Sequence, residues 1–259
     1  MDIDISTWGM IMTYLLLAPG LYILYHYRLA LVWRTLYAVV RMTVQLLLIG
    51  IFLQYLFVWH NVWINMLWLL VMIGFACGGT LSQSSLRYRQ LLLPGFGALV
   101  VSTFGVVFYF MFFIAHKGLG DAAMLIPIAG MLLGNSMRGN VVALDQFYSR
   151  LREDENSYLM RIVYGATPQE AVFPYIQQAL KTSLGPHIVT MLTLGIVSLP
   201  GMMSGQLLGG STPLVAIKYQ IAIMIGIFTV MCISSALLIV FTLPGAFLPD
   251  SRLNQKFFK

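Results

Sequence analysis

Residues 217–243, "IKYQIAIMIGIFTVMCISSALLIVFTL", contain a single charged side chain, Lys218, in an otherwise apolar or weakly polar run. A helix needs about 20 such residues to cross the ~30 Å hydrocarbon core of a bilayer. A helix also pairs its own backbone N–H and C=O groups, which lipid cannot do. The run therefore predicts a membrane-spanning helix and points to an all-α fold.

The composition of the whole chain agrees with a membrane setting. Hydrophobic residues make up 59% of the sequence, charged residues make up 9%, and the mean hydropathy is +0.84. Such values exclude a soluble domain. The net charge of +6 is explained by membrane orientation, so nucleic acid is not an expected partner. Cys77 and Cys232 lie in apolar runs and are interpreted as packing residues.

Seven apolar runs are long enough to cross a membrane. They predict a polytopic protein with about seven transmembrane helices, forming one permease domain over residues 1–259. The first run is not a signal peptide, because Asp2 and Asp4 stand where a basic flank belongs and no small-residue cleavage site follows. The predicted spans are 7–26, 38–58, 62–81, 92–115, 122–144, 185–208 and 217–243.

Basic residues indicate the orientation of these spans. With seven crossings, all lysines and arginines except Lys117 and Lys218 fall on one side of the membrane. The positive-inside rule assigns that side to the cytoplasm. We therefore expect an N-terminus outside, a cytoplasmic C-terminus and a cytoplasmic connection at about 145–184. The expected location is the bacterial inner membrane, which is a plasma membrane.

The connection contains the stretch "RIVYGATPQEAVFPYIQQAL" at 161–180. Thr167, Pro168 and Glu170 form a capping-box pattern with proline at the first helical position, which predicts a helix start. Apolar residues then recur at helical spacing on one face. Periodicity alone fits a helix resting on lipid headgroups. The residues of that face are Ala171, Val172, Tyr175, Ile176, Ala179 and Leu180.

The order Gly165, Ala166, Thr167, Pro168, then Ala171, resembles the cytoplasmic coupling loop of ABC transporter permeases. In that family the turn precedes a helix that docks on the ATPase subunit. The resemblance implies an ATPase-coupling role for these five residues. The chain departs from the family pattern upstream of the glycine, where "MRIVYG" replaces the usual acidic-alanine pair.

The chain has no phosphate-binding loop of its own, because none of its lysines follows a glycine. No catalytic site and no cofactor are expected here, and ATP is expected on a partner ATPase. A seven-span permease is expected to pair with a second copy of itself. Carriers driven by ion gradients commonly hold acidic residues at membrane depth, and no predicted span has one near its centre.

Two segments, "DAAMLIPIAGMLLGNSMRGN" from 121 and "IVSLPGMMSGQLLGGSTP" from 196, share a Gly-Met-x-x-Gly-amide pattern. Pro127 and Pro200 stand just before the two motifs, and interrupted helices with matching motifs point to a transport path. Glycine stripes with polar neighbours also serve helix packing, which is the competing interpretation. The path candidates are Met131, Asn135, Met202 and Gln206.

The longer stretches "IPIAGMLLGNSM" and "LPGMMSGQLLGGSTPLVAIKYQI" are similar to the FetB-type ABC permeases, and the likeness runs from the first span to the last. That family is associated with iron export and, in plants, with aluminium tolerance. The resemblance implies a permease subunit that exports iron or another metal ion out of the cytoplasm, powered by a separate ATPase.

Metal chemistry bears on that expectation. The candidate path offers methionine thioethers and amide oxygens, a poor cage for a hard ion. The histidines, His26, His60, His116 and His187, stand near span ends without metal-ligand spacing and are interpreted as interfacial, so no metal ligand is assigned. Two alternatives stay open: a gradient-driven carrier of a small solute, and a non-transporting membrane scaffold.

Overall fold

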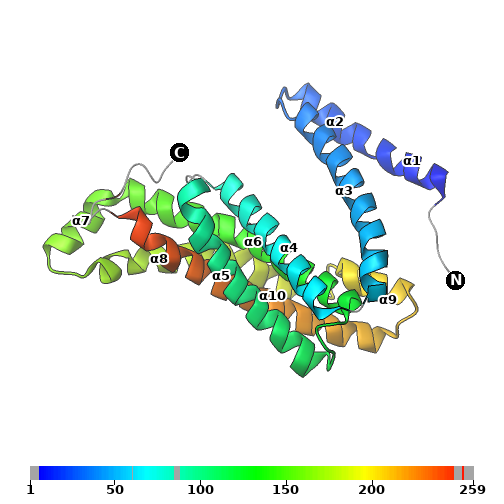
Figure 1. The fold of residues 1–259 in the computed structure, drawn as a ribbon. Coiled ribbons are helices and arrows are strands. Elements are labelled where there is room, and N and C mark those ends of the chain that lie inside the picture. The colour runs from blue at the N-terminus through cyan, green and yellow to red at the C-terminus, as the bar shows by residue number, and fades with distance from the viewer. Residues whose placement is uncertain (1–5, 60, 85–87, 248–252, 254–259) are drawn as a thin grey trace. The chain divides into compact units, whose positions relative to one another are not determined.

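A computed structural model of the chain describes residues 6–59, 61–84, 88–247 and Leu253, with only the backbone described at 88–90. The described residues form helices connected by short turns. Two isolated bridges pair residues outside these helices. This confirms the predicted all-α class. Figure 1 labels the elements along the chain.

The helices follow the apolar runs closely, with one five-residue π-helical segment. In chain order the elements are α1 (Thr7–Leu15), α2 (Leu17–His26), α3 (Val32–Trp59), α4 (Val62–Gln83), α5 (Tyr88–Tyr109), η1 (Phe110–Ile114), α6 (Ala122–Glu153), α7 (Glu155–Val163), α8 (Pro168–Thr193), α9 (Gly201–Leu208) and α10 (Pro213–Ala246).

The chain divides into two compact units: residues 1–59 with 208–210, and residues 60–207 with 211–259. We call them the N-terminal unit and the bundle unit. The division into two compact units does not show whether the two units act together as one permease domain. The single permease domain over residues 1–259 therefore stays a prediction. Each unit is described by itself.

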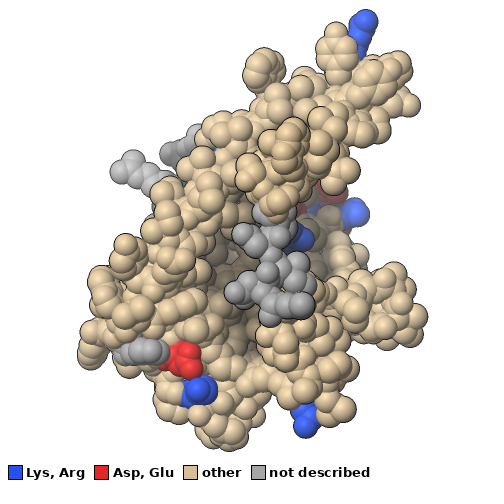
Figure 2. All heavy atoms as spheres, turned by 90° about the vertical axis from the view of Figure 1, so that its right-hand side faces the viewer, with Lys and Arg blue, Asp and Glu red and all other residues tan. Residues whose placement is uncertain are grey.

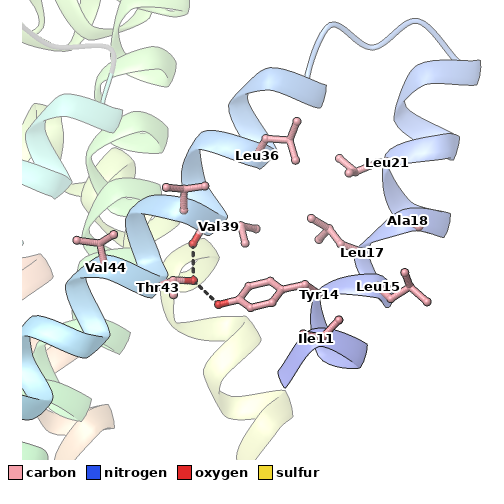
Figure 3. Close-up of a pocket in the computed structure, with 11 residues that line it drawn as sticks. Ile11, Tyr14, Leu15, Leu17, Ala18, Leu21, Leu36, Val39, Thr43 and Val44 are labelled. Atoms are coloured by element: carbon pink, nitrogen blue, oxygen red, sulfur yellow. Dashed lines mark hydrogen bonds between the residues drawn. The ribbon is translucent and has the colours of Figure 1, made fainter. Parts of the chain in front are cut away.

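The N-terminal unit consists of α1 and α2 folded back on α3. The Tyr14 hydroxyl lies 2.9 Å from the Thr43 hydroxyl, which in turn donates to the Val39 carbonyl (Figure 3). Around this pair, the helices line an apolar groove of about 590 Å³ with side chains such as Leu17, Leu21 and Leu36. The helices hold almost no buried residue, which suits segments whose apolar side chains face lipid or other membrane helices.

In the bundle unit, α6 is the central helix. It packs against α4, α8 and α10, while α10 also packs extensively against α5 (Figure 1). Glycines let helices approach at two levels: the Met137 sulfur lies over Gly79 of α4, and the Met231 side chain lies over Gly139. On the face drawn in Figure 2, charged side chains are few, and uncharged residues cover most of the surface.

Polar side chains join α6 to α10 inside the bundle. The Asn140 side-chain oxygen accepts from Ser234 at 2.9 Å and from Ser235 at 2.8 Å. About two turns along α10, the Tyr148 hydroxyl donates to Thr242 at 2.7 Å. All five residues are buried. Polar groups in lipid must find partners within the protein, so these bonds fix the register of the two helices.

In the part of the chain that the structure describes, five helical segments are long and apolar enough to cross a membrane: Thr7–His26, Val32–Trp59, Val62–Gln83, Leu91–Ile114 and Pro213–Ala246. They confirm a multi-pass membrane protein. The predicted span 122–144 lies within α6. Its polar residues make it less apolar than these five segments, so it is not among them. The number of crossings and the positions of the termini stay predictions. Arg87, Arg252, Lys256 and Lys259, which contributed to the predicted orientation, lie outside the described residues.

The predicted span 185–208 is not one helix. Its first part is the end of α8, which runs without a break from the predicted cytoplasmic connection, and its last part is α9. Between them Gly195 adopts φ +85°, and its N–H donates to the Ser198 carbonyl. The interruption expected near Pro200 is therefore confirmed. The interruption expected at Pro127 is wrong, because α6 continues through Pro127 as one helix from Ala122 to Glu153.

We expect replacing Asn140 with leucine to destabilise the bundle, because it deprives Ser235 of its acceptor at similar side-chain volume. Interhelical hydrogen bonds in membranes average about 0.6 kcal/mol each, so two lost bonds cost about 1 kcal/mol. That corresponds to a drop in melting temperature of about 2–4 °C. The exposed Asn156→Leu is the matched control. Equal melting temperatures for the two purified variants would contradict the assigned role.

Candidate functional site

The turn between α7 and α8 is built by glycine and a helix cap. Gly165 adopts φ +95°, a left-handed conformation that favours glycine, and its N–H donates to the Ile162 carbonyl. Next, the Thr167 hydroxyl accepts from the Glu170 N–H, and the Glu170 carboxylate accepts from the Thr167 N–H at 2.8 Å. This is the predicted capping box, with Pro168 at the first helical position. The predicted helix start is confirmed.

The apolar face of α8 turns toward the rest of the bundle. Ala171, Val172, Tyr175 and Ala179 are buried, while the polar Gln177 and its neighbours are exposed. The predicted amphipathic face is thus confirmed. However, Ala171 has 0% of its surface exposed, because α8 packs its small residues against α6 and α7. A partner protein cannot reach this side chain in the conformation described.

Tyr175 ties the buried face of α8 to the end of α6. Its hydroxyl donates to the Asp154 carboxylate at 3.1 Å. Burial raises the pKa of Tyr175, and the hydrogen bond and charge of Asp154 raise it further. The phenol therefore keeps its proton near neutral pH and remains a donor. The two residues line a cavity of about 550 Å³ that also holds Arg150, Glu153 and Arg161.

An exposed apolar patch lies at the end of α7, which the sequence patterns did not single out. Met160, Val163 and Tyr164 are 62%, 83% and 87% exposed. They recur at i, i+3 and i+4, so they share one face. We call them the turn patch. Phe173, in the second turn of α8, is also 56% exposed. The signal lay in the "MRIVYG" stretch, where the chain departs from the coupling-loop pattern.

The path candidates on α6 form a local pair. The Asn135 amide donates to the Met131 carbonyl at 2.8 Å, so its side chain lies along the helix surface, and both residues are partly exposed. Met202 and Gln206 stand one turn apart on α9, which is not among the helices that pack extensively against α6 in the described chain. The structure therefore does not bring the two pairs together.

The glycines beside these pairs do not mediate close helix packing within the bundle unit. A Cβ atom added at Gly134, Gly201 or Gly205 would meet nothing within 4 Å. Gly130 is different, because a Cβ there would lie 3.5 Å from the Met72 methyl group. Open glycine faces suit either a second copy of the chain or an aqueous route.

His187 is buried rather than interfacial, which corrects the interpretation from sequence. It is 9% exposed and stacks on Phe228 of α10, with ring centroids 6.3 Å apart. Its Nε2 atom has no hydrogen-bond partner in the described structure. His26 and His116 are exposed, and His60 lies outside the described residues. Position near a predicted span end misled the interpretation, because α8 continues past that end.

Within the described ranges, no group of three or more His, Cys, Asp or Glu residues is arranged to hold a metal ion. The donors near the α6 pair are thioether sulfurs and amide oxygens. Such donors suit transient contact with a cargo better than a tight resident site, because hard ions prefer carboxylate oxygens.

Comparison with known proteins places the whole chain in one group. The family described as "Uncharacterised protein family (UPF0014)" matches residues 7–247. "Protein ALUMINUM SENSITIVE 3" of Arabidopsis thaliana is 33% identical over 83% of this chain and 78% of its own length. A UPF0014 membrane protein of Synechocystis is 32% identical over 81% of both chains. The "Probable iron export permease protein FetB" of Escherichia coli is 28% identical over 85% of this chain and 84% of its own. No solved structure matches significantly.

We expect Thr167→Ala to weaken the start of α8, because the N-cap hydroxyl is lost. Such a loss costs about 1 kcal/mol. Thr167→Ser keeps the hydroxyl and is the control. The measurement is the hydrogen-exchange protection factor of the first-turn amides, which corrects for the intrinsic pH dependence of exchange.

The same protection should depend on pH. Hydrogen bonds from the Thr167 N–H and hydroxyl lower the pKa of Glu170. Its stabilising contribution is therefore complete above the ordinary carboxyl pKa and disappears as the pH falls through the lowered folded pKa. Glu170→Gln should remove this acid-induced loss. Identical acid profiles for the wild type and Glu170→Gln would show that the carboxylate does not stabilise the cap.

Proposed function

The chain belongs to the UPF0014 family of membrane proteins, and from that premise we propose that it is the permease subunit of an ABC-type exporter. The proposed cargo is iron or another metal ion moving out of the cytoplasm. The observation that carries the proposal is the match along 85% of the chain to a relative named as a probable iron export permease. A plant relative whose name refers to aluminium sensitivity also supports a metal cargo.

Energy comes from a separate ATPase in this proposal. The chain lacks a G-x-x-x-x-G-K-[ST] loop, so ATP has to be bound elsewhere. The capped turn at Gly165, Ala166, Thr167 and Pro168 supports docking of an ATPase there, because it presents a rigid helix start at the predicted cytoplasmic side. The turn patch supplies exposed apolar surface of the kind that occupies the centre of a protein interface.

Ala171 enters this proposal in a changed role. Its buried side chain cannot touch the ATPase, but it lets α8 lie close to its neighbours in the bundle. A force applied at the turn is then transmitted through α8 into the membrane part of the bundle. Docking contacts themselves are assigned to Tyr164 and its two neighbours in the turn patch.

The route for the cargo is proposed to lie between two copies of the chain. Gly134, Gly201 and Gly205 leave open helix faces beside the amide and methionine side chains. A symmetric dimer would place each of these faces against its counterpart. Met131, Asn135, Met202 and Gln206 are the proposed lining residues.

We expect Tyr164→Asp to release the ATPase, because it places a charge in a desolvated contact. In co-purification with the cognate ATPase, retention should fall at least about tenfold, which corresponds to a hot-spot residue. Gln169→Asp, an exposed substitution two residues into α8, is the matched control. Unchanged retention in Tyr164→Asp together with unchanged ATP-dependent export would refute docking at the turn patch. Export that persists without any ATPase would favour a gradient-driven carrier.

The path assignment has its own test. Asn135→Leu should abolish metal-stimulated ATP hydrolysis while basal hydrolysis and melting temperature stay close to those of the wild type. The reason is that the Asn135 amide donates within its own helix, so its removal breaks no hydrogen bond between helices. Asn140→Leu serves as the comparison, because there we expect the melting temperature to fall. An Asn135→Leu protein that melts earlier but exports metal normally would remove Asn135 from the path.

A further inference from the structure

Arg138 is an exposed cation on the outward face of α6. The residues on either side of it face inward: Met137 packs on Gly79 of α4, and Gly139 packs under Met231 of α10. On a helix this places Arg138 on the opposite side, and it is exposed. Met131, Asn135 and Arg138 recur at i, i+4 and i+7, so Arg138 shares the face of the proposed path residues.

The depth of Arg138 follows from its neighbour on α4. Gly79, which lies beside Met137, is one turn before the end of α4 at Gln83. In the predicted orientation, α4 ends at the cytoplasmic side. Arg138 therefore lies roughly 6 Å, one helical turn, inside the cytoplasmic end of the membrane helices. That is where cargo coming from the cytoplasm would first meet the path.

Arg138 has no carboxylate partner among the residues that the structure describes. Within the described ranges, Lys117 pairs with Asp121 and Arg150 pairs with Glu153, and neither pair includes Arg138. Asp145 lies two turns farther along α6 and is engaged in another interaction. The described part of the N-terminal unit, residues 6–59, contains no Asp or Glu. Whatever the position of that unit, its described residues supply no carboxylate that could neutralise the Arg138 guanidinium.

We propose that Arg138 binds an anionic group of the cargo at the cytoplasmic entrance of the path, so that the metal is exported as a complex with a carboxylate- or phosphate-bearing ligand rather than as a bare cation. This inference rests on the proposed function and specifies its substrate class. The proposal also explains why the path residues offer thioether sulfurs and amide oxygens, because a chelated metal needs no carboxylate ligands from the protein.

The chemistry of the guanidinium fits this role. Its planar fork of N–H donors matches a carboxylate or phosphate with two parallel hydrogen bonds. An unpaired charge beside low-dielectric walls concentrates ions of the opposite sign and repels ions of its own sign. A bare divalent cation would meet repulsion at this entrance, whereas an anionic complex would be attracted. Asn135, one turn deeper, keeps its side-chain oxygen available because its amide nitrogen is bonded to Met131.

A lipid headgroup is the other source of the same anionic chemistry. An arginine near the end of a membrane helix can extend toward the headgroups and bind a lipid phosphate. The two sources differ in what Arg138 affects: binding of a soluble anionic complex, or stability in a membrane that contains anionic lipid. The test therefore needs bilayers with and without anionic lipid.

The test uses the full-length permease without its ATPase, in vesicles of phosphatidylcholine alone. The probes are radioactive iron(III) citrate and, under reducing conditions, iron(II) alone. We expect saturable binding of iron citrate, competition by metal-free citrate, and weaker binding of iron(II). Arg138→Gln should weaken citrate binding at least about tenfold, and Arg138→Lys should weaken it less. Arg150→Gln, on the cytoplasmic end of the same helix, is the matched control and should bind as the wild type does.

The contrary results are distinct. Tighter binding of iron(II) alone than of iron citrate, no binding of iron citrate by the wild type, or equal citrate binding by Arg138→Gln, would overturn the inference. So would an Arg138→Gln defect confined to melting temperature in vesicles with phosphatidylglycerol, which identifies a headgroup contact. The binding measurements contain no ATPase, so they test Arg138 separately from transport. Failure of the proposed function would instead appear as a lack of ATP-dependent export.

Discussion

The contact between α6 and α10 is the interaction on which the bundle unit depends. In lipid, helices gain nothing by hiding apolar surface from each other, so close packing and polar pairs have to hold them together. Asn140 with two serines, and Tyr148 with Thr242, provide the polar pairs. Gly139 provides the close approach. These contacts set the rotation of α6 about its own axis.

That rotation decides what α6 presents outward. Once Asn140 and Gly139 face α10 and Met137 faces α4, the remaining side of the helix carries Asn135 and Arg138. The polar residues of α6 therefore fall into two classes with different consequences. Asn140 and Tyr148 face inward and join α6 to α10, whereas Asn135 and Arg138 face outward and are available to a ligand or a second copy of the chain.

The length of α8 connects the predicted cytoplasmic side to the membrane part of the bundle. One uninterrupted helix runs from the cap at Thr167 to beyond His187, a distance of about 30 Å. Tyr175 anchors it to Asp154 near one end, and the His187 ring stacks on Phe228 farther along. A displacement of the capped turn therefore moves buried contacts directly, with no flexible loop between them.

Local chemistry explains which predictions from sequence were confirmed. The capping box depends on residues three positions apart, and the buried face of α8 depends on helical periodicity, so both were readable without the fold. The composition likewise determined that the chain is a multi-pass, all-helical membrane protein, because only helices satisfy the backbone in such apolar segments. The break near Pro200 followed from local residue types as well.

Other properties depend on which helices become neighbours, and only the tertiary structure decided them. Periodicity showed that Ala171 lies on an apolar face but not that α6 and α7 cover it. Proximity to a predicted span end suggested an interfacial His187, whereas packing against Phe228 buries it. Asn135 and Asn140 are the same residue type on the same helix, yet Asn135 is partly exposed and Asn140 is buried. The sequence alone determines where the helices lie and which of their faces are apolar. Which neighbouring helix covers each face is decided by contacts between residues far apart in the chain.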